Sequence, residues 1–459
     1  MMNETIAAIA TAPGEAGIGI VRISGDKAIE ILERIFRPRK DIRVMDIQSR
    51  KVTYGYVSDS EGQKIDEVLA IIMRGPYSYT TEDVVEIQCH GGIIPVRKIM
   101  EQVLKAGAVL AEPGEFTKRA FLNGRIDLSQ AEAVIDVITS KTETGLNAAV
   151  GQLGGSISKE IRSIMDMLVS AIAHIEASID FPEHDIEEVT EENIKNIVAG
   201  VKNRLEELTG SFEEGRIIRD GLTTAIVGRP NVGKSSLLNV LIEENKAIVT
   251  EIPGTTRDII EEFLNIGGVL IKLVDTAGIR ETEDIVEKLG VERTKKAIAE
   301  AELVILVIDF SEELQGEDKE IIDMLRDKKV IVAANKIDLG SKADIAYLDG
   351  RFGSGSIIKI SAREELGIEA LKKSIRDLVY QGNIGIRKNN MITNIRHKDL
   401  LEKAAECAGR ALKSIEEGIP VDLLSVDIRE AWTYLGKITG DTVEEDIIHE
   451  IFSKFCVGK

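Results

Sequence analysis

Short apolar runs alternate with helix-periodic segments over the first part of the chain. The runs are typical of strands and lie at residues 5–10, 18–23, 68–73, 84–88 and 109–111. Apolar residues with helical spacing lie at residues 28–36 and 96–104, and Gly107 ends the second of these segments. This alternation predicts an N-terminal α/β domain with a mixed sheet over residues 1–120.

A helical pattern replaces this alternation at about residue 121. Apolar residues recur at three- and four-residue steps from Val150 to Ile179, which predicts one long helical stripe that ends at Asp180-Phe181-Pro182. A second helix is expected over residues 194–208. Strands and helices alternate again over residues 217–380, and residues 381–459 are helical once more. We therefore predict a helical domain, residues 121–216 and 381–459, with a second α/β domain, residues 217–380, inserted into it.

The inserted domain opens with Gly-Arg-Pro-Asn-Val-Gly-Lys-Ser at residues 228–235. An apolar run precedes this sequence and a helical pattern follows it, which is the context of a phosphate-binding P-loop. The glycines let backbone N–H groups point at a phosphate chain, Lys234 would reach the β- and γ-phosphates, and Ser235 would bind Mg²⁺. The plain alternative is a glycine-rich turn that contains a lysine by chance.

Three further motifs end predicted strands of the same domain. They are Asp275-Thr276-Ala277-Gly278, Asn335-Lys336-Ile337-Asp338 and Ser361-Ala362. The Asp275 carboxylate can hold a metal through water, and Asp338 can accept two hydrogen bonds from guanine that adenine cannot donate. These motifs and the P-loop predict a GTP site at the carboxyl edge of an open parallel sheet, as in Ras-like domains.

Composition narrows the compartment and the partners. Hydrophobic residues make up 43% of the 459 residues, but no apolar run approaches the roughly 20 residues of a membrane span, and the N-terminus lacks signal-peptide features. Cys89, Cys407 and Cys456 form no C-x-x-C pair, so we expect a protein of the reducing cytoplasm. With a net charge of -20, the chain must hold any RNA through a local basic patch or a basic partner.

Polar residues at predicted strand ends offer a second candidate site in the N-terminal domain. Arg22 and Glu86 stand out there, with a solvated surface ion pair as the plain interpretation. Cys89 and His90 cannot act as nucleophile and base, because neighbours on a strand face opposite ways. By composition alone, Cys456 near the C-terminus is an incidental thiol.

Taken together, these segments resemble the MnmE family (also called TrmE) of tRNA-modification GTPases over the whole chain. Besides the GTP motifs, the resemblance rests on residues 5–11, 21–25, 86–92, 113–124, 180–182, 254–258 and the terminal Cys456-x-Gly-Lys459. It implies that the chain, as a homodimer and in a heterotetramer-type complex with the FAD-binding partner MnmG, adds an aminomethyl-type group to carbon 5 of the wobble uridine of certain tRNAs. Formyl- or methylene-tetrahydrofolate would be the one-carbon donor.

The resemblance also implies site residues. Arg22, Glu86 and Lys459 match the folate contacts, and Arg125 stands where some relatives have Lys, which keeps the charge but changes its geometry. Cys456 becomes a catalytic or site residue. The implied GTP contacts are Asn231, Val232, Gly233, Lys234, Ser235, Ser236, Thr250, Thr255, Thr256, Asp275, Thr276, Ala277, Gly278, Asn335, Lys336, Asp338, Ser361 and Ala362.

Hydrolysis must differ from that of Ras, because Ile279 stands where Ras has the glutamine that orients water. The resemblance implies that Glu287 takes this role. It further implies that K⁺ replaces an arginine finger when two GTP domains meet. Asn231, Thr250, Ile252 and Thr255 would hold this K⁺, while Ser235 and Thr256 hold Mg²⁺.

A GTP switch that acts only as a ribosome or RNA assembly factor is the alternative. The motifs of residues 228–362 fit both functions. The folate-like N-terminal domain and the terminal Cys-x-Gly-Lys favour tRNA modification, because an assembly switch needs neither.

Overall fold

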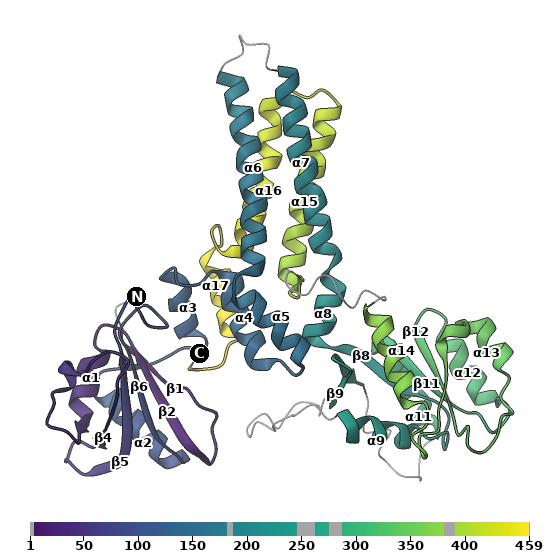
Figure 1. The fold of residues 1–459 in the computed structure, drawn as a ribbon, viewed down its shortest axis with the longest axis horizontal. Coiled ribbons are helices and arrows are strands. Elements are labelled where there is room, and N and C mark those ends of the chain that lie inside the picture. Colours follow the sequence, from purple (N-terminus) through teal and green to yellow (C-terminus); the bar gives the residue numbers. More distant parts are fainter. Residues whose placement is uncertain (1–3, 181–186, 246–261, 275–286, 381–390, 459) are drawn as a thin grey trace.

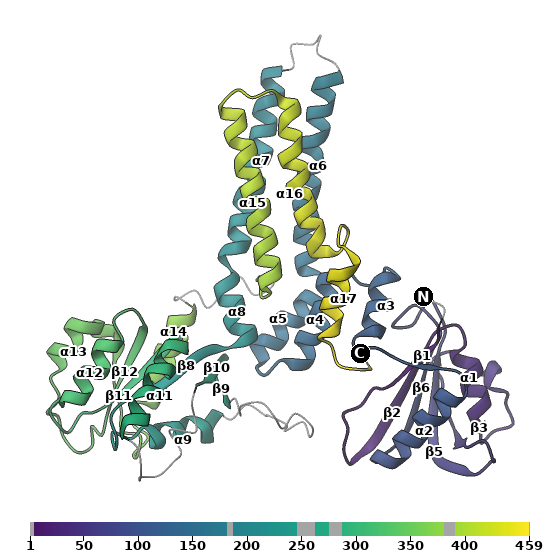
Figure 2. The ribbon, with the colours of Figure 1, turned by 180° about the vertical axis from the view of Figure 1, so that it is seen from behind.

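The computed structural model describes residues 4–180, 187–245, 262–274, 287–380 and 391–458. A helical bundle stands between two α/β domains, which lie on opposite sides of its foot (Figures 1 and 2). No helix among these residues is long and apolar enough to span a bilayer. The predicted fold class, two α/β domains with one inserted into a helical domain, is confirmed.

The N-terminal sheet has seven strands in the order β3-β4-β5-β6-β2-β1-β7. Neighbouring strands are antiparallel except for the parallel pair β1 and β7. The strands are β1 (Ile6–Ile9), β2 (Ala16–Ser24), β3 (Phe36–Pro38), β4 (Val52–Ser58), β5 (Lys64–Met73), β6 (Val84–Gly91) and β7 (Val109–Leu110). Sequence patterning predicted this mixed sheet but missed β3 and β4, because each buries few apolar residues.

Different helices pack on the two faces of this sheet. Helices α1 (Ala28–Ile35) and α2 (Ile93–Lys105) form one core with Val21 and Ile23 of β2. Side chains alternate across a strand, so Arg22 points to the other face. There its guanidinium lies 5.7 Å from the ring centre of Phe116, on helix α3 (Glu115–Leu122).

The helical domain is built from chain segments on both sides of the inserted domain. Four long helices share one core: α6 (Ser156–Asp180), α7 (Glu187–Gly210), α15 (Ile395–Glu416) and α16 (Val421–Thr439). Shorter helices lie at the foot of the bundle: α4 (Leu128–Thr139), α5 (Glu143–Leu153), α8 (Phe212–Asp220) and α17 (Glu445–Ser453). The chain thus leaves the bundle after α8 and returns to it at α15.

The expectation of one helical stripe from Val150 to Ile179 was wrong. The chain forms two helices there, because α5 ends at Leu153 and α6 begins at Ser156. Gly155 between them has a φ of 82°, a left-handed conformation that interrupts a helix. The apolar periodicity continues across the break, so it could not reveal the break.

The inserted domain has a six-stranded sheet in the order β13-β12-β11-β8-β10-β9. Its strands are parallel except for β9, which pairs antiparallel with β10. They are β8 (Leu222–Val227), β9 (Glu262–Ile266), β10 (Val269–Leu273), β11 (Leu303–Asp309), β12 (Lys329–Asn335) and β13 (Ile357–Lys359).

Helices cover both faces of this sheet, so the strands are buried on both sides. Helices α9 (Lys234–Asn245) and α14 (Ile368–Tyr380) pack into one core, and α11 (Glu287–Glu300), α12 (Gly316–Met324) and α13 (Ile345–Phe352) pack into the other. The carboxyl edge of such a doubly wound sheet is the usual place for a ligand.

Candidate functional site

The loop between β8 and α9 has the backbone shape of a phosphate cradle. Asn231 and Gly233 have φ values of 62° and 99°, and α9 begins at Lys234. A Cβ atom on Gly233 would lie 2.2 Å from Nδ2 of Asn335, so only glycine fits. Backbone N–H groups at such a loop and helix start attract anions.

Lys234 is held inside this loop. Its Nζ donates hydrogen bonds of 2.8 Å to the carbonyl oxygens of Gly228 and Arg229. Burial lowers the pKa of Lys234. With no carboxylate bonded to its ammonium among the described residues, the lysine fits a phosphate chain that replaces the two carbonyl contacts.

Asn335 joins the predicted base-binding motifs to the P-loop. Its Nδ2 donates to the carbonyl of Val232 at 2.8 Å, and its Oδ1 accepts from the N–H of Ala362 at 2.9 Å. The side chain is buried. Ser361 is buried next to it, while Asp338 is exposed.

Lys336 is positioned by a partner that sequence reasoning missed. Its φ is 64°, and its Nζ lies 2.6 Å from Oδ2 of Asp309, the last residue of β11. Burial would raise the pKa of Asp309, but hydrogen bonds from Lys336 and Ser311 outweigh it and lower the pKa. The sequence did offer one indication of Asp309, because this residue ends a strand that lies next to β12, the strand that leads into Asn335 and Lys336.

Part of the predicted GTP site lies outside the described residues. This holds for Thr250, Ile252, Thr255, Thr256, Asp275, Thr276, Ala277 and Gly278. Glu287 is the first residue of α11, and its side chain is not among the described ones. Within the described residues, Asn335 at the end of β12 joins the P-loop at Val232 to Ala362, which follows β13.

Arg22 and Glu86 meet on the N-terminal sheet. They are register partners on β2 and β6, and Nε of Arg22 lies 2.9 Å from Oε1 of Glu86. Their side chains are only 19% and 18% exposed, so this is not the solvated pair of the plain interpretation. The described residues donate no hydrogen bond to Oε2 of Glu86, which leaves that oxygen for a ligand.

The C-terminal tail docks at this pair. The carbonyl of Gly458 accepts a 3.1 Å hydrogen bond from Nη1 of Arg22. Val457 forms a β-bridge with Pro113, and the carbonyl of Cys456 accepts from the N–H of Gly114 at 3.3 Å. The Cys456 side chain is exposed and unbridged. Lys459 lies outside the described residues.

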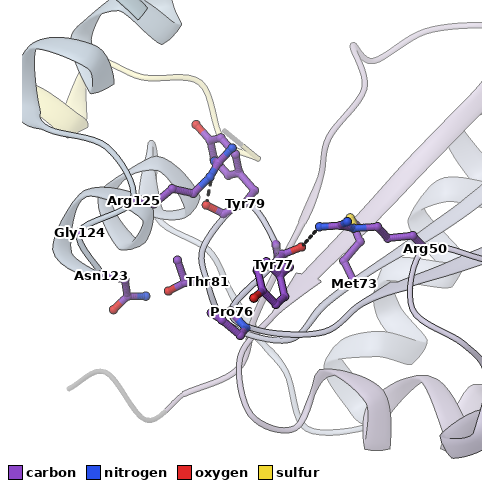
Figure 3. A pocket seen from close by; sticks show the side chains of 10 residues that line it. Arg50, Met73, Pro76, Tyr77, Tyr79, Thr81, Asn123, Gly124 and Arg125 are labelled. Carbon is purple, nitrogen blue, oxygen red and sulfur yellow. Dashed lines mark hydrogen bonds between the residues drawn. The ribbon is translucent and has the colours of Figure 1, made fainter. Parts of the chain in front are cut away.

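Arg125 lies on a neighbouring cavity rather than in contact with Arg22. Its Nη1 donates to the carbonyl of Tyr79 at 3.0 Å, and its guanidinium lies 4.7 Å from the ring centre of Tyr79. Figure 3 shows this stacking at the edge of a cavity of about 570 Å³. Arg50 and Asn123 also line the cavity, and the sequence did not single out either as a site residue, although Asn123 lies in the segment 113–124 that carries the family resemblance.

Cys89 and His90 point to opposite faces, as predicted. Cys89 is buried, and its burial raises the pKa of the thiol to about 11. His90 is exposed and lies 2.7 Å from Asp66. The pair therefore offers no nucleophile with an adjacent base.

The fold and the P-loop geometry define a multidomain P-loop GTPase. A family model described as the MnmE helical domain matches residues 128–456, and one described as the GTP-binding protein TrmE N-terminus matches residues 5–125. The chain belongs to the MnmE family of tRNA modification GTPases, which confirms the resemblance found in the sequence.

Individual relatives match over their full length. The tRNA modification GTPase MnmE of Alkaliphilus oremlandii is 51% identical over 459 residues, covering 100% of both chains. That of Acetivibrio thermocellus is 52% identical over 458 residues, covering 100% of this chain and 99% of the relative. Among solved structures, the G domain of the T. maritima FeoB iron transporter is 28% identical, with a TM-score of 0.25, and covers 34% of this chain and 97% of that one.

Proposed function

We propose that this chain is a cytoplasmic, K⁺-dependent GTPase that acts with MnmG to modify carbon 5 of the wobble uridine of certain tRNAs. About half of its residues are identical to those of full-length relatives named tRNA modification GTPase MnmE. One contact supports a function beyond GTP binding: the hydrogen bond from Arg22 to Gly458, which brings the tail with Cys456 to the Arg22–Glu86 pair. An assembly switch has no use for this contact.

In the GTPase domain, Lys234 and the backbone of residues 231–236 would hold the phosphates, and Asp338 would read the base. Ser235 and Thr256 would hold Mg²⁺, and Asn231, Thr250, Ile252 and Thr255 would hold K⁺. Cations there neutralise negative charge that develops during phosphoryl transfer. Glu287 would orient the attacking water. In this proposal the K⁺ site forms fully only when the GTPase domains of two chains come into contact. Hydrolysis should therefore require the homodimer.

In the N-terminal domain, Arg22, Glu86, Arg125 and Lys459 would bind a tetrahydrofolate that carries the one-carbon unit. The Glu86 carboxylate suits the N–H donors of a pterin ring, and Arg22 holds that carboxylate in place. Cys456 would act at this site. MnmG would bring FAD and, since this chain is acidic, most of the affinity for tRNA.

Mass spectrometry of tRNA nucleosides tests the proposal. Cells lacking this chain should lose the modified wobble uridine, wild type should restore it, and Cys456→Ser should not. Lys454→Gln, at an exposed residue nearby, is the control and should restore it. An unchanged nucleoside profile on deletion would favour the assembly switch. The K⁺ dependence has its own test, since equal GTPase rates in K⁺ and Na⁺ would contradict it.

A further inference from the structure

The cavity beside Arg125 has the size and lining of a small-molecule site. Its volume is about 570 Å³, within the range of ligand pockets, roughly 300–1,000 Å³. Two tyrosines and two arginines contribute to its wall: Tyr77, Tyr79, Arg50 and Arg125. Figure 3 shows the two guanidinium groups on either side of the loop that carries the tyrosines.

Both guanidinium groups are fixed by backbone rather than by acids. Nη2 of Arg50 donates to the carbonyl of Tyr77 at 2.7 Å, and Nη1 of Arg125 donates to that of Tyr79 at 3.0 Å. Neither arginine forms an ion pair with a carboxylate among the described residues. Two positive charges that stay unneutralised in one cavity, on a chain with a net charge of -20, favour an anionic ligand.

The wall that carries these arginines is already ordered. Nδ2 of Asn123 donates to the carbonyl of Thr80 at 2.6 Å, and Oγ of Ser78 donates to that of Glu82 at 2.5 Å. The N–H of Gly75 donates to Asp83 at 2.9 Å. A ligand therefore meets a preformed surface and costs little ordering of the protein when it binds.

Contacts connect the cavity to the Arg22–Glu86 pair. The hydroxyl of Tyr79 lies 3.0 Å from Oγ1 of Thr117, and Tyr79 packs against the small core that contains Phe116. Phe116 in turn lies under Arg22. One helix, α3, thus supplies neighbours to both sites, so an elongated ligand bound at Glu86 can extend toward the cavity.

We propose that this cavity is a subsite for the γ-linked glutamate tail of a polyglutamylated folate. This inference rests on the proposed folate function. In this proposal the pterin lies at Glu86 and the acidic end of the molecule extends past α3 toward Arg125, where each added glutamate would supply a carboxylate that Arg50 can bind bidentately. The tyrosine rings suit the flat aminobenzoyl group that joins the pterin to the tail.

Titration calorimetry of the full chain with 5-formyl-tetrahydrofolate monoglutamate and triglutamate tests the subsite. We expect the triglutamate to bind about tenfold tighter, the value of one well-placed charge-assisted contact. Arg50→Gln should lower the affinity for the triglutamate to that for the monoglutamate, and it should leave the affinity for the monoglutamate unchanged. Arg50→Lys should give a ratio of the two affinities between those of wild type and Arg50→Gln. The control is Arg97→Gln, at an exposed arginine of α2, which should keep the wild-type ratio.

Each other result has a distinct meaning. Binding of neither folate would contradict the proposed folate function itself. Equal affinity of the two folates for wild type, or a tenfold ratio that persists in Arg50→Gln, would contradict only the subsite. If Arg50→Gln instead weakened tRNA binding and left the folate ratio unchanged, the cavity would be a nucleic-acid contact and the subsite would be wrong.

Discussion

Oε2 of Glu132 lies 2.7 Å from Nε2 of His397, although 265 residues separate them. Glu132 is on α4 and His397 on α15, so this contact joins the two halves of the helical domain across the inserted domain. Arg396 completes the cluster with hydrogen bonds of 2.9 Å to each oxygen of Glu132, and it also donates to the carbonyl of Lys437 on α16. The contact lies where the chain returns from the GTPase domain.

Glu132→Gln should destabilise the helical domain by about 3–5 kcal/mol, because it leaves the half-buried guanidinium of Arg396 and the buried ring of His397 without their carboxylate partner. Trp432 is the only tryptophan and packs against the bundle core, so its fluorescence during urea unfolding reports on this domain. Asp399→Asn removes an exposed ion pair with Lys403 on α15 and is the control. It should cost less than about 1 kcal/mol. Equal losses for the two variants would contradict a special role for the buried cluster.

The same cluster predicts a pH dependence. Burial would raise the pKa of Glu132 from 4.5, but His397 and Arg396 outweigh it and lower the pKa to about 2. Because the pKa of Glu132 is lower in the folded state than in the unfolded state, its ionised carboxylate stabilises the fold at any pH above the unfolded-state pKa of about 4.5. This stabilisation is lost as the pH falls from about 4.5 toward 2. The stability gap between wild type and Glu132→Gln, measured through Trp432, should therefore narrow over that range. If the difference in unfolding free energy between the two proteins stayed constant from pH 7 to pH 3, ionised Glu132 would not be the source of this stability.

Asn335→Asp should weaken guanine-nucleotide binding about tenfold or more. The substitution keeps an acceptor for the N–H of Ala362 but replaces the donor to Val232 with an oxygen that faces the carbonyl. Titration with a fluorescent GDP analogue measures the affinity. Asn239→Asp, at an exposed position of α9, adds the same charge near the loop and should have little effect. If both variants weaken binding equally, net charge rather than the lost hydrogen bond is responsible.

Glu287→Ala should leave GTP binding intact and nearly stop turnover, since the carboxylate is proposed to orient water rather than to hold the nucleotide. Single-turnover hydrolysis in K⁺, measured beside nucleotide affinity, separates the two effects. Glu292→Ala changes an exposed glutamate of the same helix and serves as the matched control. Normal turnover of Glu287→Ala would assign the catalytic role to another residue.

The sequence predicted features that depend on local pattern, and it named Arg22 and Glu86 as candidates without fixing the strand register that joins them. The P-loop and Asn335 were predictable because a strand followed by a motif fixes its own position at the sheet edge. The Arg22–Glu86 contact depends on how β2 and β6 pair, which alternation of apolar residues alone does not determine. The resemblance to a family supplied what the periodicity could not.

Other features arise only from tertiary packing. Nothing in the sequence distinguishes Glu132, Arg396 and His397 from other residues of a helix. They come together only because the chain returns to the bundle after the inserted domain. The cavity at Arg50 is formed by loops, whose geometry depends on hydrogen bonds between distant residues such as Asn123 and Thr80. No periodic pattern in the sequence carries that information.

Gly458→Ala should displace the C-terminal tail from the N-terminal domain. Gly458 has a φ of 94°, and a Cβ atom there would lie 2.5 Å from the carbonyl oxygen of Ile9, so the tail must shift. Arg22 would then lose its 3.1 Å hydrogen bond to the Gly458 carbonyl, and we expect folate to bind about tenfold more weakly. Calorimetry with 5-formyl-tetrahydrofolate measures this loss, and faster amide exchange at Gly114 would report the displaced tail. Gly17→Ala, at a strand position with open space around it, is the control. Unchanged folate affinity in Gly458→Ala, together with faster exchange, would show that the tail docks without contributing to the site.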